Sequence, residues 1–404
     1  MTDELDRPIG ERVAIYRRRR GLSQAVVAGL VGRSESWLSQ VERGTRSVDR
    51  LSVLIDLSKV LRVDIATLTG QPFELGPNGD DGFGAVAGIR AAVNDHRFEP
   101  SDAPEARDVA AIEAAVSEGQ GLYQGAQYGR AGALAPLLVR HAEAATRTLE
   151  GADRSRAFSA LATAYHLVTA LLSRTGETEL GWVTADRAIR AADEAENADL
   201  VAVGLYRLGH VMLRAGRADE AHHLAISGVA RAGIGDPTGP GRVSLHGALA
   251  LIAAISAARN DDRRETLRLL READHHADAL GDDRNDHWTA FGPTNVRIHA
   301  TSCAVELGDA ADAIRNGETV HPERLAPGLR GRRSHVHIDL AWAYGQQRND
   351  PATVLSLLEA ERVAPEAIRY NVAARELLRE CLKRERRLAT PGLRGLADRV
   401  GITG

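Results

Sequence analysis

Six turn signals divide the chain beyond about residue 104 into segments of similar length. The turns occur in stretches such as RAGRADEA and ELGDAADA, and they centre on Gly129, Gly176, Gly216, Asn260, Gly308 and Asn349. The sequence numbers of successive turns differ by 47, 40, 44, 48 and 41, and an amphipathic helical pattern flanks each turn. This recurrence predicts stacked helical hairpins, because a single hairpin cannot bury its apolar face without a neighbour.

In residues 1–70 the turn signals lie closer together, and their spacing predicts five short helices. Gly21, Gly32 and Gly44 are expected helix ends, and Ser23 and Ser34 are suitable N-caps for the helices that follow the first two. The expected helices cover residues 8–20, 24–31, 34–44 and 48–61, with a last turn at DIATLTG. Two short helices joined by a brief turn, the second polar on its outer face, predict a helix-turn-helix unit.

The stretch IGERVAIYRRRRGLSQAVVAGLVGRSESWLSQVERG resembles the Cro/phage-repressor type of helix-turn-helix domain, the XRE family. The resemblance extends over residues 1–70. It rests on these features in order: Gly10, the basic run before Gly21, LSQ, Ala28, Gly32, Ser34, Ser39 and ERG. One departure is Arg33, which stands where the family places a buried aliphatic residue and which would add a cation near the DNA backbone.

In a domain of this type the third helix enters the major groove of double-stranded DNA. With Leu38 and Val41 facing inward, the side chains left facing outward are those of Glu35, Ser36, Ser39 and Gln40. These residue types suit base edges, since glutamine can pair with adenine and glutamate can accept from cytosine. The alternative is a merely solvated face, which the presence of the whole domain pattern disfavours.

The resemblance also implies contacts with the phosphate backbone, which position the helix without specifying sequence. For Trp37, core packing is as good an interpretation as phosphate contact. The predicted phosphate-contacting residues are Gln24, Arg33, Ser34, Trp37, Arg43, Thr45 and Arg46. One copy of the module covers little DNA, so we expect a homodimer on a palindromic operator, with the helical hairpins as the dimer platform.

Charge separates the two parts of the chain. Residues 1–70 hold 12 Lys and Arg against 9 Asp and Glu, a balance of +3, whereas the remainder holds 39 against 46, a balance of −7. The basic first part suits a polyanion. Neither an apolar run long enough to cross a bilayer nor a secretory signal is evident, and Cys303 and Cys381 lie far apart. We therefore expect a cytoplasmic protein without disulfides.

Residues 71–103 are rich in Gly, Pro and Asp and predict a linker with a short helix near residues 83–93. Beyond it, residues 207–232 (RLGHVMLRAGRADEAHHLAISGVARA) resemble a tetratricopeptide repeat (TPR). The expected fold class is therefore all-α, a helix-turn-helix domain followed by a TPR-like, right-handed array over residues 104–404. HWTAFGPTN and the last segment resemble the C-terminal halves of actinobacterial XRE regulators with TPR-like sensor domains, and more distantly peptide-sensing quorum receptors.

Aromatic and polar side chains opposite the apolar stripes of first helices are candidates for an effector site, since ligand pockets combine apolar walls with few polar groups. The alternative is interhelix packing with a few satisfied polar residues. The candidates are His166, Tyr206, Arg207, His210, Trp288, Phe291, Asn295 and His299. In the last four, 3/4 spacing suggests one helix face, although Pro293 interrupts it.

The sequence contains no motif for catalysis, for a cofactor or for a metal. Adjacent histidines such as His222 and His223 point to different faces of a helix, which disfavours a metal site. We therefore expect a DNA-binding transcriptional regulator controlled by a small-molecule or peptide effector. The alternative is a TPR-like interaction scaffold localised to DNA by its helix-turn-helix domain.

Overall fold

The computed structural model describes residues 8–46, 48, 51–61, 63, 68, 84–94, 108–385 and 388–402. Contacts between residues divide the chain into two compact units, Met1–Glu74 and Leu75–Gly404. Within the described ranges the regular structure is helical, without strands, so the predicted all-α fold class is confirmed.

The first unit contains four described helices, whose ends differ from the predicted ones by at most three residues. The side chains of Ser23 and Ser34 accept hydrogen bonds from the backbone N–H groups of Val26 and Trp37, as expected of N-caps. The fifth predicted helix lies outside the described residues, apart from Leu68, which is buried. The helices are α1 (Ile9–Arg19), α2 (Gln24–Leu30), α3 (Glu35–Glu42) and α4 (Leu51–Leu61).

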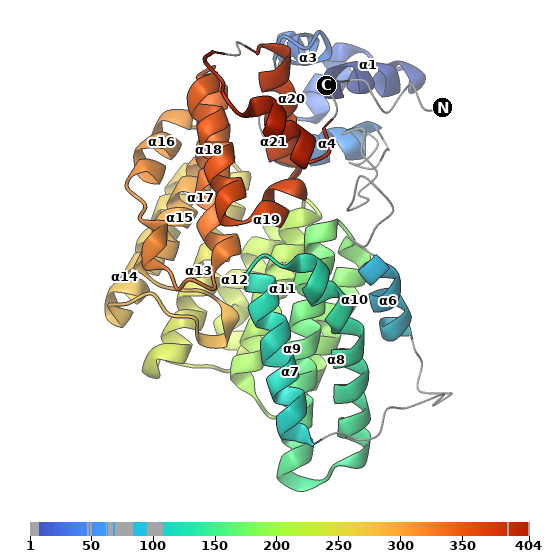
Figure 1. Cartoon of the computed structure of the whole chain (residues 1–404), viewed down its shortest axis with the longest axis vertical. Helices are drawn as coiled ribbons and strands as arrows, with labels where there is room; N and C mark the ends of the chain where they lie inside the picture. Colours follow the sequence, from blue (N-terminus) through green and yellow to red (C-terminus); the bar gives the residue numbers. More distant parts are fainter. Residues whose placement is uncertain are drawn as a thin grey trace. The chain divides into compact units, whose positions relative to one another are not determined.

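The second unit is an array of helical hairpins (Figure 1). The first half comprises α6 (Gly84–Asn94), α7 (Val109–Gln124), α8 (Tyr128–Thr148), α9 (Gly151–Thr175), α10 (Thr178–Glu194), α11 (Ala198–Arg214), α12 (Ala218–Ala232), α13 (Gly239–Arg259) and α14 (Arg263–Leu280). The second half comprises η1 (Asp286–Trp288), α15 (Pro293–Glu306), α16 (Ala310–Glu318), η2 (Pro322–Arg324), α17 (Arg330–Gln346), α18 (Asp350–Val363), α19 (Pro365–Arg369), α20 (Val372–Lys383) and α21 (Leu393–Arg399).

The predicted turns separate the two helices of each hairpin. Five of them lie between paired helices, and Gly129 lies just inside the start of α8. Gly176, Gly216 and Gly308 adopt φ angles of 82°, 73° and 72°, in the left-handed region that favours glycine. The short helix expected near residues 83–93 is α6, which packs on α8 within the second unit.

The first helices of the hairpins, α7, α9, α11, α13, α15 and α17, form an inner layer. Each packs on the next first helix, whereas each second helix packs on its own partner and on the first helix that follows it. The inner layer also returns to its start, because α17 contacts α7. At this contact a Cβ atom on Gly331 of α17 would lie 3.4 Å from the Gln124 carbonyl oxygen of α7, and it would lie 3.0 Å from the Tyr128 hydroxyl oxygen of α8.

Helix α13 lies at the centre of this layer. By length and composition it is apolar enough to cross a bilayer, with a mean hydropathy of 1.4, but 72% of that apolar window is buried within the array. Gly247 of α13 leaves room for the ring of Phe291, whose Cζ atom would lie 1.9 Å from an added Cβ. Close packing of this kind explains why small residues recur along the helix.

Candidate nucleic-acid interface and inner layer of the array

Helix α3 presents two different faces. Trp37, Leu38 and Val41 are buried in the core of the first unit, at 5%, 0% and 1% exposure. On the outer face Glu35 and Ser36 are exposed, and the other two predicted base-contacting residues, Ser39 and Gln40, are half-buried. The structure therefore gives this helix a polar face that other molecules can reach.

A buried ion pair fixes α3 against α1 and α2. The Arg17 guanidinium donates to both carboxylate oxygens of Glu42, from Nε at 2.5 Å and from Nη2 at 2.8 Å. Gln24 Nε2 donates to the same carboxylate at 2.7 Å, and Arg17 Nη1 donates to the Leu22 carbonyl oxygen. The Arg17 and Glu42 side chains are only 12% and 6% exposed, so water screens the pair weakly.

The direction in which the pKa of Glu42 is shifted agrees with this geometry. Burial opposes ionisation of the Glu42 carboxyl, but hydrogen bonds from Arg17 and Gln24 outweigh it and lower its pKa. The close packing extends to the backbone, since a Cβ atom on Gly10 would lie 1.9 Å from the Val41 carbonyl oxygen. The sequence pattern contained the basic run and ERG, but the pairing of these distant segments was not foreseen.

Trp37 takes the core position that the sequence left open as one of two alternatives. Its indole lies in the apolar cluster, and its Nε1 atom is buried without a hydrogen-bond partner among the described residues. The Arg33 guanidinium lies over this ring, with Cζ 5.8 Å from the ring centroid. Arg33 thus covers the indole where a family member would place an aliphatic side chain.

The residues that follow α3 are exposed, as phosphate-contacting residues must be. Arg43 Nε donates to the Ser39 carbonyl oxygen at 3.1 Å, and Thr45 Oγ1 donates to the Gln40 carbonyl oxygen at 3.1 Å. Both carbonyl oxygens also accept backbone N–H bonds, that of Ser39 from Arg43 and that of Gln40 from Thr45 and Arg46. Arg46 is exposed as well.

The predicted effector residues come from α9, α11 and the segment before and within α15. Six of these eight side chains are buried, with exposures of at most 7%, and His210 and Trp288 are half-buried. Pro293 begins α15, so the 3/4 spacing does not run through this segment: Trp288 ends η1, and Phe291 fills the space beside Gly247. Packing explains Phe291 fully.

Several of the other candidates do meet. Arg207 Nη2 donates to the Trp288 carbonyl oxygen at 3.2 Å, and the Tyr206 and His210 rings pack edge to face at 4.8 Å. His299 Nδ1 lies 2.9 Å from the Asn295 carbonyl oxygen. The structure adds residues that the sequence pattern did not single out, namely Tyr123, Arg174, Arg214, Arg332 and His335.

Buried polar atoms without a partner accompany these residues. Among the described residues His166 Nε2, Arg207 Nε, Arg174 Nε and Asn295 Oδ1 make no hydrogen bond. Burial, followed by the charge of Arg207, lowers the pKa of His166 to about 3, so the imidazole is neutral at pH 7. Unpartnered buried groups are rare in folded proteins and mark places of functional interest.

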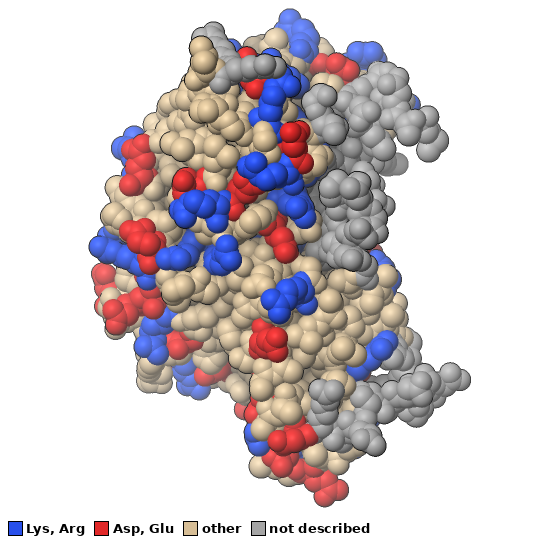
Figure 2. Space-filling view, in the orientation of Figure 1, with Lys and Arg blue, Asp and Glu red and all other residues tan. Residues whose placement is uncertain are grey.

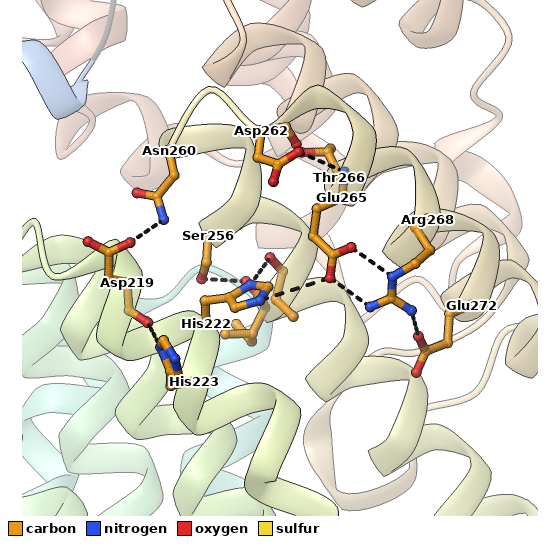
Figure 3. Close-up of polar contacts among 12 residues, drawn as sticks. Asp219, His222, His223, Ser256, Asn260, Asp262, Glu265, Thr266, Arg268 and Glu272 are labelled. Atoms are coloured by element: carbon orange, nitrogen blue, oxygen red, sulfur yellow. Dashed lines mark hydrogen bonds and ion pairs between the residues drawn. The ribbon is translucent and has the colours of Figure 1, made fainter. Parts of the chain in front are cut away.

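The histidines of α12 have separate partners (Figure 3). His222 Nδ1 lies 3.4 Å from the Ala253 carbonyl oxygen and its Nε2 lies 3.9 Å from Glu265, whereas His223 Nδ1 lies 2.9 Å from the Asp219 carbonyl oxygen. A hollow of about 360 Å³ beside them is lined by Asp262, Arg264, Glu265, Arg268 and Arg271. Arg268 is already paired with Glu265 and Glu272, so the charges in this region are largely compensated (Figure 3).

Comparison with known proteins decides the character of the first unit. Residues 8–69 match the helix-turn-helix domain family. The chain thus carries a DNA-binding domain of this kind. No curated protein sequence matches the chain.

The chain is similar to a solved structure described as "Crystal Structure of Rap Protein Complexed with Competence and Sporulation Factor". The identity is 12% and the TM-score 0.43, with 72% of this chain and 92% of that chain covered. At this TM-score the likeness supports no conclusion about function.

Proposed function

We propose that the protein is a sequence-specific transcriptional regulator of the XRE type, with a TPR-like sensor array of the kind found in actinobacterial regulators. The observation that carries this proposal is the polar outer face of α3 on a matched helix-turn-helix domain. The Arg17–Glu42 pair holds that face in place, and rigid support is what base recognition requires.

In this proposal Glu35, Ser36, Ser39 and Gln40 contact base edges. The residues that contact phosphates are Gln24, Arg33, Ser34, Arg43, Thr45 and Arg46, whereas Trp37 lies in the core. Gln24 Nε2 carries two N–H groups, and Glu42 accepts from one of them, so the other can donate to a phosphate oxygen. The protein acts as a homodimer on a palindromic operator, so that two copies of α3 lie one turn of DNA apart.

The array supplies control by linkage. An effector that binds the inner layer better in one arrangement of the two DNA-binding units than in the other shifts the population between them. A small molecule or peptide bound near Arg207, His210, Asn295 and His299 would therefore change operator affinity. The unpartnered buried atoms of the inner layer support this location.

Fluorescence anisotropy with labelled duplex DNA tests the DNA-binding part of the proposal. We expect affinity to fall steeply with salt, and Arg43→Ala to weaken binding to all sequences alike and to reduce the salt slope by about one. Arg268→Ala, an array variant on a compensated surface, is the matched control. Duplex binding that is insensitive to both salt and Arg43→Ala would refute the assignment of this end of α3 to phosphate.

A further inference from the structure

Several arginines of the inner layer have no carboxylate partner among the residues that the structure describes, and four of these lie near the aromatic residues Tyr123 and Tyr128 or the histidines His210 and His335. They are Arg174 on α9, Arg207 and Arg214 on α11, and Arg332 on α17. Other arginines of the array are ion-paired, for example Arg259 with Glu306 at 2.9 Å and Arg263 with Asp309 at 3.0 Å. Basic and acidic side chains also lie next to each other over much of the visible array (Figure 2).

The four arginines lie around one place, although they come from three helices. Arg332 follows Gly331, whose backbone closely approaches the Tyr128 hydroxyl, and Arg174 lies over the Tyr128 ring. Arg214 ends α11, which packs on α9, and Arg207 lies on the same face two turns earlier. Arg174 Cζ lies 4.3 Å from the ring centroid of Tyr128 and 5.8 Å from that of Tyr123, at the place where α17 returns to α7. Burial favours the neutral phenol of Tyr123, but Arg174 and Arg207 outweigh it and lower its pKa. Positive charge therefore dominates this place.

The positive charge also acts on two histidines, His335 and His210. Burial lowers the pKa of His335 to about 3, and Arg332, Arg174 and Arg214 contribute to this shift. Burial also lowers the pKa of His210 well below its usual range, together with Arg207, Arg332 and Arg214. Both imidazoles are neutral at pH 7 and add hydrogen-bonding groups without adding charge.

Three carboxylates lie near the cluster. Glu306 pairs with Arg259, and Glu366 accepts from the backbone N–H of Gly129 at 3.1 Å. Asp339 accepts from the Ser302 hydroxyl at 2.5 Å and lies 3.8 Å from His335 Nε2, and burial raises its pKa to about 7, which reduces its negative charge. Four guanidinium charges therefore outnumber the negative charges beside them.

Solvent reaches the cluster, so a ligand can as well. Arg214 is exposed, and Arg174, Arg332, His210 and His335 are half-buried. Deeper in the cluster Arg207 is 7% exposed and Tyr128 1%. Neither the Arg207 Nε nor the Tyr128 hydroxyl has a hydrogen-bond partner within the described ranges. Unpaired cations beside one another cost free energy, and a bound anion would remove that cost.

We propose that the effector of this protein is a small anion with at least two negative charges, held by Arg174, Arg207, Arg214 and Arg332. This inference rests on the proposed function of the inner layer as the effector site. Arginine suits both carboxylate and phosphate oxygens, because its planar fork donates two parallel hydrogen bonds. Tyr123, Tyr128 and the neutral histidines supply the remaining polar contacts.

Calorimetric titration of the full chain with pyrophosphate and, separately, with citrate tests the proposal, with ionic strength held constant by NaCl. We expect at least one probe to bind, and Arg214→Gln and Arg332→Gln each to weaken it roughly tenfold or more. The preferred probe separates phosphate from carboxylate ligands. Arg268→Gln, on the compensated surface of α14, should bind as the parent does.

Two results would overturn the proposal: neither probe binds the parent protein, or Arg268→Gln weakens binding as much as Arg214→Gln. The titration contains no DNA, so its outcome is independent of DNA binding by α3. A protein that binds DNA but neither anion would retain its function as a DNA-binding regulator and lose only the proposed effector class.

Discussion

Arg17 and Arg214 occupy similar places in different units, since each lies in the last turn of a helix that packs on its neighbours. The Arg17 guanidinium is bound on two sides by the buried carboxylate of Glu42. Arg214 has no carboxylate partner among the described residues and lies near Arg174 instead. The pKa of Arg214 is lowered to about 10, first by the surrounding protein and then by Arg174, although the side chain is partly exposed.

The contrast shows how two uses of the same residue can be told apart. A buried charge with a full set of partners holds elements together, and the first unit uses Arg17 in this way. Clustered charges without partners do not stabilise a fold, so the inner layer of the array needs another reason to contain them. Binding of an oppositely charged ligand provides that reason.

The largest expected effect comes from breaking the ion pair between Arg17 and Glu42 in the first unit. Glu42→Ala leaves the Arg17 charge buried and unpaired and removes the acceptor of Gln24, which should cost the first unit about 3–5 kcal/mol. Hydrogen exchange of residues 9–44 in the full chain measures this loss. Glu220→Ala, which breaks the exposed pair with Arg217 in the array, should leave protection of residues 9–44 unchanged, because water screens that pair.

The same pair predicts a pH dependence. The folded pKa of Glu42 lies below its usual value, so its contribution is complete above the unfolded pKa and is lost as pH falls through the folded pKa. Protection of residues 9–44 should therefore drop in acid for the parent protein more than for Glu42→Ala. Equal acid sensitivity, or unchanged protection in Glu42→Ala at neutral pH, would show that the ion pair does not hold α3.

An intermediate effect is expected from the unpartnered groups of the inner layer. His166 is 1% exposed and its pKa is about 3 in the folded protein. Below about pH 6.5 the unfolded chain therefore binds a proton at His166 that the folded chain does not bind. Protonation of the unfolded chain therefore lowers the free energy of unfolding as pH falls. Between pH 7.5 and pH 5 the parent should lose about 2 kcal/mol more of this free energy than His166→Gln. Urea unfolding at the two pH values measures the difference, and identical losses would contradict neutral burial of His166.

The smallest expected effect concerns Arg214 in the absence of ligand. Arg214→Gln relieves repulsion with Arg174 and should raise the thermal midpoint of the array, by roughly 2 °C or less. By contrast, Arg259→Gln removes the partner of Glu306 and should lower the thermal midpoint. Differential scanning calorimetry in a buffer of monovalent ions makes the comparison. A lower midpoint for Arg214→Gln would mean that the inner arginines support the fold.

Much of the architecture could be predicted because its signals are local. Ser23 and Ser34 cap helices as expected, and the left-handed glycines fall at the predicted hairpin turns. Which face of α3 is apolar also followed from spacing alone, through Leu38 and Val41.

The remaining features depend on contacts between residues far apart in the sequence. Arg17 meets Glu42 only because Gly10 lets α1 approach α3, and Phe291 enters the core only because Gly247 leaves a space. The closure of the inner layer joins α17 to α7 across the whole array, so no local pattern could place Arg332 beside Arg174. The 3/4 spacing across Pro293 failed for a local reason, since proline begins a helix there.

The central claim is that α3 reads bases through its outer face. Selection of bound duplexes from a randomised pool, carried out in parallel with the parent protein and with Gln40→Ala, tests this claim directly. We predict a defined operator for the parent and, for Gln40→Ala, a relaxed preference at one position in each half-site, worth about 1–3 kcal/mol. Identical preferences for the two proteins, or no preference for either, would contradict the claim.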